Sequence, residues 1–323
     1  MWPKESMSQS LPVLSFALPV FNEANGLEEF YNQLTTALKP LANKYRFEFV
    51  FVNDGSRDQS LTMLTSLQAR DDRIKVLDFS RNFGHQAAIT AGIDEATGEA
   101  VVVMDTDLQD SPAVVLELIS AWESGADVAY AQRISRQDPW LKKLTARVYY
   151  RLMARLSDVE IPQNVGDFRL IDRKVVEVLE QCRETNRYVR GLISFAGFKQ
   201  VAVPFHRSER FAGTSGYSVA KMLKLASDGL TSFSDAPLQL ATYLGLGAAA
   251  LAFLGIVYVL CMRIFDASAT VPGWTLLMIV ILVPSSLQMI LLGLMGQYIG
   301  RIYSEVRRRP LYIIKDKIGK FSK

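Results

Sequence analysis

Cysteine and histidine are scarce in this chain of 323 residues, which contains two of each. Cys182 and Cys261 are too few for a disulfide framework, and they fit a reducing compartment. His85 and His206 lie far apart in the sequence and lack the spacing of a zinc site. The sequence also has no Gly-x-Gly-x-x-Gly segment after its first predicted strand and no P-loop motif. These absences exclude a dinucleotide-cofactor enzyme and a P-loop NTPase.

Charged side chains are almost absent from residues 236–300, where only Arg263 and Asp266 occur, although 21% of the whole chain is charged. Two nearly uncharged runs lie there, at residues 238–264 and 274–299. Each exceeds the roughly 20 residues that a helix needs to span a bilayer. The sequence therefore predicts a two-helix transmembrane hairpin within residues 237–300, and Pro284 is expected to bend its second helix.

The charge on either side of this hairpin predicts its orientation. Residues 301–323 carry a net charge of +6, whereas residues 1–235 sum to −3. The positive-inside bias places both flanks in the cytosol, with only the short connecting loop on the other side. We therefore expect a protein of the cell (inner) membrane whose large domain and both termini are cytosolic. Apolar residues at helical spacing in residues 217–236 predict an amphipathic juxtamembrane helix on the membrane surface, with a domain-covering helix as the alternative.

Residues 12–216 show the pattern of a soluble α/β domain that follows a short N-terminal tail, residues 1–11. The β-rich runs begin at Val13, Phe47, Ile74, Ala100 and Asp127, and a helical pattern follows each of the first four. Regular alternation of this kind predicts a mostly parallel sheet with helices on both faces. Ligands of such sheets bind beyond the carboxyl ends of the strands, so the residues directly after each strand are the candidates for function.

Polar, turn-forming motifs follow the first four predicted strands. They are Pro-Val-Phe-Asn-Glu (residues 19–23), Asn-Asp-Gly-Ser (53–56), Ser-Arg-Asn-Phe-Gly (80–84) and Asp-Thr-Asp-Leu-Gln-Asp (105–110). Each motif alone is also typical of an ordinary turn. Two carboxylates separated by one residue at a strand end, such as Asp105 and Asp107, can serve a ribose hydroxyl and a divalent cation. A cation in that place bridges diphosphate oxygens and stabilises a departing nucleoside diphosphate.

In this order the four motifs resemble those of the family 2 glycosyltransferases that act on polyprenyl phosphates. Two further segments, Asn-Val-Gly-Asp-Phe-Arg-Leu (residues 164–170) and Gly-Gln-Tyr-Ile-Gly-Arg-Ile-Tyr (296–303), are most similar to the bactoprenol (undecaprenyl-phosphate) glucosyltransferases of phage serotype conversion. Dolichyl-phosphate mannose synthases and undecaprenyl-phosphate aminoarabinose transferases are similar but less close. The resemblance spans residues 13 to about 314.

This resemblance implies a GT-A type, Rossmann-like nucleotide-sugar-binding domain. It implies inverting transfer of a hexose, with glucose from UDP-glucose as the first choice, to polyprenyl phosphate at the cytosolic membrane face. It also implies Mg²⁺ or Mn²⁺ as cofactor. UDP-N-acetylglucosamine, UDP-galactose and GDP-mannose stay open as donors, and a non-catalytic membrane partner that binds nucleotide sugar is the alternative from another class. A processive polysaccharide synthase is disfavoured, since the chain has no Gln-x-x-Arg-Trp motif.

The resemblance also implies roles for individual residues. It assigns donor binding to Pro19, Phe21, Glu23, Val52, Asp54, Asn82, Gly84, Asp105 and Thr106; metal binding to Asp105, Asp107 and Gln109; catalysis to Asp167 and Asp107; and acceptor or phosphate contacts to Arg133, Arg207, Arg210 and Ser215. Asp167 is the family's proposed base, yet a lipid phosphate is already anionic near neutral pH. Whether Asp167 takes a proton, orients the acceptor or holds a metal-bound water therefore stays open.

The expected partners are a UDP-sugar, polyprenyl phosphate and the lipid bilayer, and no nucleic acid is implied by a soluble part that is slightly acidic. The spacing of Gly296 and Gly300 permits close helix contact, within one chain or between copies in a homo-oligomer. One position departs from the family, which commonly has lysine where Gly216 stands. Arg207 or Lys221 is expected to replace that phosphate contact.

Overall fold

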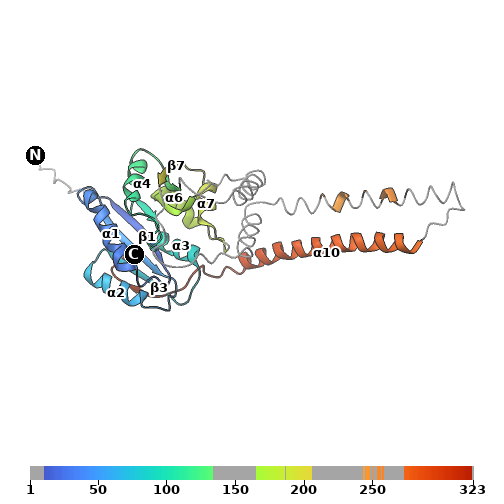
Figure 1. Cartoon of the computed structure of the whole chain (residues 1–323), viewed down its shortest axis with the longest axis horizontal. Coiled ribbons are helices and arrows are strands. Elements are labelled where there is room, and N and C mark those ends of the chain that lie inside the picture. Colours follow the sequence, from blue (N-terminus) through green and yellow to red (C-terminus); the bar gives the residue numbers. More distant parts are fainter. Residues whose placement is uncertain are drawn as a thin grey trace, which may run out of the picture. The chain divides into compact units, whose positions relative to one another are not determined.

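The computed structural model describes residues 11–133, 165–185, 187–205 and 273–321, together with single positions between residues 243 and 257 (Figure 1). The chain divides into two compact units. The first contains residues 1–150, 159–216 and 310–323, and the second contains residues 151–158 and 217–309.

The first unit begins with the predicted alternation of strands and helices. Its elements are β1 (Val13–Val20), α1 (Leu27–Leu38), β2 (Arg46–Asn53), α2 (Ser60–Arg70), β3 (Ile74–Phe79), α3 (His85–Glu95), β4 (Ala100–Val103), α4 (Val114–Glu123) and β5 (Val128–Arg133). A short 3₁₀ helix, Lys39–Leu41, follows α1. The predicted mostly parallel α/β fold is confirmed, because β4, β1, β2 and β3 pair side by side in parallel register.

The core lies on both faces of this sheet. From Leu14 onward β1 is buried throughout, as expected of a parallel strand covered on both sides. Phe16 packs into a cluster with α1 and α4, while the neighbouring Ala17 packs into a cluster with α3 on the opposite face. Burying a side chain such as Phe16 contributes about 1.5–3 kcal/mol, so burial on both faces stabilises the sheet that carries the candidate site.

The second half of the first unit adds β6 (Val165–Asp172), α6 (Arg173–Gln181), α7 (Val189–Phe195) and β7 (Gln200–Phe205). With β8 (Ile314–Ile318) at one edge, the sheet order is β7-β5-β6-β4-β1-β2-β3-β8. Strand β6 lies between β5 and β4 and runs antiparallel to both, with Arg169 opposite Val103. Since Asp167 lies two residues before Arg169 and Asp105 lies two residues after Val103, this register brings both carboxylates to the same edge of the sheet.

The C-terminal residues correct one prediction. Residues 301–323, expected to form a single basic tail, are divided in the structure, and Ile314–Ile318 forms the edge strand β8 antiparallel to β3. The sequence did not indicate this strand, because only Ile314 and Ile318 are half-buried and the three charged residues between them are exposed. Tyr312, just before β8, stacks on Phe79 with ring centroids 5.2 Å apart.

The second unit contains α10 (Gly273–Val306), a helix of 34 residues that continues through Pro284. The bend expected at this proline stays a prediction, because the helix assignment runs through it without a break. No helix in the described part of the chain is both long enough and apolar enough to cross a membrane. The transmembrane hairpin stays a prediction, and the juxtamembrane helix expected at residues 217–236 lies outside the described residues.

Candidate active site

Four loops meet at the carboxyl edge of the central strands, as the sequence predicts for β1 to β4. The loop after β1 is fixed by the start of α2 and the residues before it. Asn22, in the left-handed region at φ 57°, accepts a hydrogen bond from Arg57 N through Oδ1 at 2.8 Å. The backbone N–H of Glu23 donates to Ser60 Oγ at 3.0 Å. This loop leaves Phe21 46% exposed and Glu23 half-buried, so both can meet a ligand.

Asp54 organises the loop after β3. Its carboxylate accepts hydrogen bonds from the backbone N–H of Phe83 at 2.7 Å and of Gly84 at 3.0 Å, and from Asn82 Nδ2 at 2.9 Å. Burial raises the pKa of Asp54, although these hydrogen bonds oppose the shift. Asp54, Asn82 and Gly84 are therefore brought together as predicted, but the carboxylate of Asp54 is directed at the protein's own backbone.

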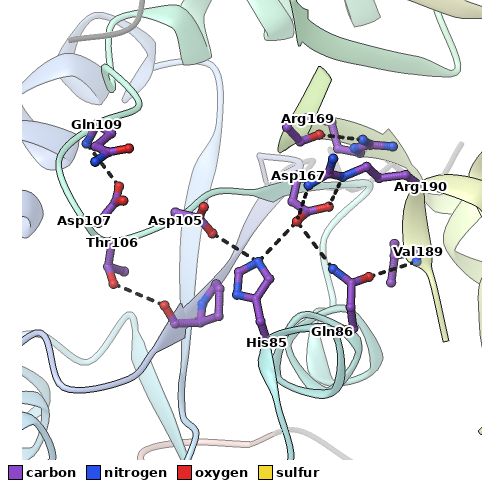
Figure 2. A network of polar contacts seen from close by, with 12 residues as sticks. His85, Gln86, Asp105, Thr106, Asp107, Gln109, Asp167, Arg169, Val189 and Arg190 are labelled. Carbon is purple, nitrogen blue, oxygen red and sulfur yellow. Dashed lines mark hydrogen bonds and ion pairs between the residues drawn. The ribbon is translucent and has the colours of Figure 1, made fainter. Parts of the chain in front are cut away.

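The loop after β4 carries the predicted metal ligands. Thr106 is buried and its hydroxyl donates to the carbonyl of Pro19 at 3.1 Å, which ties this loop to β1 (Figure 2). Asp107 Oδ1 accepts from the backbone N–H of Gln109 at 3.1 Å across Leu108, whose φ is 61°. This turn leaves the carboxylates of Asp105 and Asp107 partly exposed at the strand end.

The donors of this loop fit a hard divalent cation. Carboxylate and amide oxygens suit Mg²⁺ or Mn²⁺, and Mg²⁺ is commonly held by one or two carboxylates with substrate phosphates completing its coordination. Among the described residues, no group of three His, Cys, Asp or Glu side chains is placed to hold a metal ion by itself. The oxygen donors of Asp105, Asp107 and Gln109 therefore fit part of the coordination shell of a cation whose other ligands come from a diphosphate.

Asp167 is the most enclosed carboxylate of the site. It lies on β6 with 7% of its side chain exposed, and Arg190 of α7 donates to both of its oxygens, from Nε at 2.7 Å and from Nη2 at 3.0 Å (Figure 2). His85, the first residue of α3, places Nε2 at 3.2 Å from Asp167 Oδ2 and at 3.5 Å from Asp105 Oδ1. His85 thus joins the predicted catalytic carboxylate to a predicted metal ligand.

The pKa shifts in this cluster favour an ionised Asp167 beside a protonated His85. Burial alone would raise the pKa of Asp167, but hydrogen bonds from Arg190 and His85 outweigh it and hold the pKa well below its usual range. Burial alone would likewise lower the pKa of His85, but the Asp167 and Asp105 carboxylates raise it above its ordinary value. Arg169 is buried beside Asp167, and burial lowers its pKa to about 10. Asp167 is therefore an anion among cations.

The other predicted site residues are buried, lie near Gly166 or lie outside the described part of the chain. Val52 is fully buried in a cluster with Leu77 and Ala88, so its side chain belongs to the core and not to an open base pocket. Pro19 is buried and offers its carbonyl to Thr106. The guanidinium of Arg133 lies beside Gly166, within 3.2 Å of where a Cβ would stand. Arg207, Arg210 and Ser215 lie outside the described residues.

Four residues of the cluster were missed by sequence reasoning: His85, Gln86, Arg169 and Arg190. The first two directly follow the Ser-Arg-Asn-Phe-Gly motif, so their place at a strand's carboxyl end was a usable signal. Arg169 is two residues from Asp167, and that spacing puts both on one face of a strand once β6 is known. Nothing in the sequence around Arg190 marks it, because its partner lies 23 positions away.

The fold places this cluster as a candidate active site at the carboxyl edge of an α/β sheet, and comparison with known proteins gives the class of the chain. Residues 15–179 match the model of glycosyl transferase family 2. The chain belongs to this family and is a glycosyltransferase.

Relatives match over nearly the whole chain. The Bacillus subtilis protein named uncharacterized glycosyltransferase YkcC is 46% identical over 94% of each chain. The prophage bactoprenol glucosyl transferase homolog of Escherichia coli is 40% identical over 94% of this chain and 98% of its own. The bactoprenol glucosyl transferase of Shigella phage SfII is 41% identical over 94% of this chain and 97% of its own.

Solved structures are more distant. The mannosyltransferase PcManGT from Pyrobaculum calidifontis, solved with GDP-Man and Mn²⁺, is 16% identical with a TM-score of 0.46 and covers 80% of this chain and 82% of its own.

Proposed function

We propose that this glycosyltransferase moves a hexose from a nucleotide sugar to the phosphate of a polyprenol, with UDP-glucose as the first-choice donor. The observation that carries the proposal is the cluster in which His85 joins the Asp105-x-Asp107 loop to Asp167. Relatives named bactoprenol glucosyl transferase, 40% and 41% identical over nearly the whole chain, support the acceptor and the sugar.

Three residues would hold the cation: Asp105, Asp107 and Gln109. When bound, Mg²⁺ or Mn²⁺ supplies charge stabilisation to the leaving nucleoside diphosphate. The chain itself supplies positioning. The loop after β1 offers Phe21 and Glu23 to the nucleoside, and Asp54 holds the neighbouring Asn82–Gly84 loop in place. Arg133, at the end of β5, offers a fixed guanidinium to phosphate oxygens. Attack by the lipid phosphate from the face opposite the diphosphate inverts the anomeric configuration.

We further propose that the reaction takes place at the cytosolic face of the cell membrane. The substrates themselves support this location, since a sugar nucleotide is soluble in water and a polyprenyl tail is not. Helix α10 supports it as well. Apolar side chains such as Val280, Met289 and Ile299 are 59%, 71% and 60% exposed, which suits a lipid environment. The basic residues 307–309 after this helix suit anionic headgroups.

Purified full-length protein tests the function directly. We expect incubation with UDP-glucose, undecaprenyl phosphate and Mn²⁺ to give a glucosyl lipid and free UDP, detected by thin-layer chromatography and mass spectrometry. UDP-N-acetylglucosamine, UDP-galactose and GDP-mannose, each offered alone, identify the donor. An α-linked product, read by proton NMR, would contradict inversion, and no lipid product with any of the four donors would contradict the proposal.

A further inference from the structure

Three nitrogens of the Arg190 side chain donate hydrogen bonds to residues of strand β6. Nε and Nη2 donate to the two oxygens of Asp167 at 2.7 and 3.0 Å, and Nη1 donates to the carbonyl of Val165 at 2.8 Å. A two-pronged guanidinium–carboxylate contact fixes the plane of the carboxylate as well as its position. The third contact fixes the guanidinium itself on β6. Arg190 therefore determines how Asp167 is oriented, although the two residues belong to different elements.

Helix α3 completes the enclosure of Asp167. Gln86 Nε2 donates to Asp167 Oδ2 at 3.4 Å, and Gln86 Oε1 accepts from the backbone N–H of Val189 at 3.0 Å. This second contact ties α3 to the residue directly before Arg190. The side chain of Asp167 is 7% exposed, while that of His85 is 46% exposed. Of these two neighbours, His85 is therefore the more accessible side chain, and its ring nitrogen points at Asp167 (Figure 2).

The charges around Asp167 keep it ionised. Arg169, 3% exposed, donates to the carbonyl of Gly166 and faces Asp167 from the same strand. Protonating Asp167 would leave Arg190 and Arg169 without a buried counter-ion, which is strongly unfavourable. The charged groups that act directly on this carboxylate are Arg190 on α7, His85 on α3 and Arg169 on β6. Tyr188, Tyr130 and Asp105 act on those three neighbours, and Arg133 lies beside Gly166, which precedes Asp167.

We propose that Arg190 is a positioning residue that holds the ionised carboxylate of Asp167 in place, with Oδ2 directed at His85. Asp167 then orients the site and accepts no proton from the acceptor. The inference rests on the proposed function and revises the role of base that the family resemblance gives to Asp167. A lipid phosphate that is already anionic needs alignment more than deprotonation. The fixed carboxylate of Asp167 contacts His85 and holds its imidazole in place for that alignment.

A double-mutant cycle tests this role. Arg190→Gln removes the positive charge and the paired N–H donors to Asp167. Arg190→Lys keeps the charge but not the two parallel donors. Asp167→Asn removes the negative charge. We expect Arg190→Gln to lower kcat by about 100-fold or more with a smaller change in the KM for the nucleotide sugar. Arg190→Lys should recover part of this loss. Arg190→Gln combined with Asp167→Asn should lose no more than Asp167→Asn alone, within about threefold, because Arg190 acts through Asp167.

Arg183 provides the matched control. It pairs with Asp94 at 2.7 Å, at the end of α3 opposite to His85, so Arg183→Gln removes one arginine–aspartate pair without touching the cluster. We expect this variant to keep kcat within about twofold of the unmodified protein, as for a surface substitution. Losses that add in the double variant, or an Arg190→Gln protein as active as Arg183→Gln, would overturn the assignment.

The ionisation of Asp167 can also be measured without turnover, from the thermal unfolding midpoint of the full chain in detergent between pH 7 and pH 5. With Arg190 present, the depressed pKa of Asp167 adds stability above the unfolded-state value of about 3.9, and this contribution is constant over the range. Without Arg190, only His85 and Arg169 oppose the effect of burial, so we expect the pKa of Asp167 to rise and ionised Asp167 to destabilise the fold at pH 7. The Arg190→Gln midpoint should then rise relative to the unmodified protein as the pH falls.

Adding Asp167→Asn to Arg190→Gln should remove this extra pH dependence. A merely structural role of Arg190 predicts instead the same drop in midpoint at every pH, with or without Asp167→Asn, and that result would contradict the inference. The two tests separate this inference from the proposed function. A protein that transfers no sugar from any donor refutes the function, while the unfolding series still decides whether Arg190 holds Asp167 ionised.

Discussion

At the scale of single residues, the aspartates of the site differ in role because they differ in surroundings. The carboxylate of Asp54 accepts hydrogen bonds from the backbone of the Asn82–Gly84 loop. Asp105 and Asp107 end a strand and stay partly exposed, as ligands of an exchangeable cation must. Asp167 is enclosed and paired with Arg190. Four carboxylates that look alike in the sequence thus divide into one loop anchor, two metal-ligand candidates and one buried anion.

Gly55 supports the donor loops through its lack of a side chain. Its φ is 64°, and a Cβ there would lie 2.5 Å from the carbonyl carbon of Arg81 and from Asn82 N. We expect Gly55→Ala to lower stability by about 1–3 kcal/mol through strain and backbone displacement, measured by denaturant unfolding. It should also raise the KM for the donor. Gly125→Ala is the control, since Gly125 also has positive φ, at 90°, but has nothing within 4 Å. Equal donor KM values in the two variants would contradict this role.

Asp107 is the residue at which the metal assignment is tested. We expect Asp107→Ala to reduce turnover by about 100-fold or more and to weaken the response to added Mn²⁺, because it removes one charged ligand. The unfolding midpoint should stay nearly unchanged. Glu117→Ala, on exposed α4 surface, removes the same charge as a control. Chelation with EDTA should abolish the activity of the unmodified protein, and activity that survives both EDTA and Asp107→Ala would exclude a metal at this loop.

At the scale of elements, two strands shape the first unit in ways that alternation alone does not reveal. Strand β6 enters the sheet antiparallel between β4 and β5 and delivers Asp167. Strand β8 pairs with β3 from the far end of the chain. An aromatic series links β8 to the site, since Tyr312 stacks on Phe79, whose ring meets that of Phe83 at 5.6 Å. The backbone N–H of Phe83 is held by Asp54.

Tyr312 is therefore expected to stabilise the edge where β8 docks. Its hydroxyl donates to Asp94 at 2.8 Å, and its ring covers Phe79. We predict that Tyr312→Ala destabilises the protein by about 2–4 kcal/mol through lost packing, whereas Tyr312→Phe loses only the hydrogen bond, about 1 kcal/mol. Urea unfolding of both variants provides the measurement. Equal losses would mean that the stacked ring contributes nothing beyond its hydroxyl.

At the scale of the whole molecule, the chain combines an α/β enzyme unit with a second unit whose described helix, α10, exposes many large apolar side chains. A strand of the first unit, β8, follows that helix in sequence. The chain therefore leaves the enzyme unit, forms α10 and returns to complete the sheet. Deletion of the residues that form β8 should therefore destabilise the enzyme unit.

Membrane attachment gives the prediction at this scale. If residues 237–300 are embedded in lipid, the expressed protein should sediment with membranes, stay there in 1 M salt and resist alkaline carbonate, measured by immunoblotting of the fractions. Attachment through the basic residues 301–323 alone would be screened, because the Debye length falls to about 3 Å at 1 M ionic strength. Release of the protein by salt would thus contradict an embedded hairpin.

Local patterns predicted much of this molecule. The elements from β1 to β5 follow from hydrophobic periodicity, and their boundaries agree within a few residues, because two-sided burial leaves a direct mark on each strand. The loops with Asp54 and Asp105 follow from their place after strands. Val52 was misassigned, because its position at a strand end does not reveal that it points into the core. Strand β8 was missed, because its charged residues resemble a tail.

The sequence by itself determined the α/β fold, the sheet edge at which the candidate site lies and the acidic loop after β4, because all of these depend on residues close together in the chain. Only the tertiary structure decided the partners of Asp167. His85, Arg169 and Arg190 come from three elements, and the antiparallel insertion of β6 brings them together. Pairing between distant segments depends on the register of strands and the docking of helices, which no local pattern encodes.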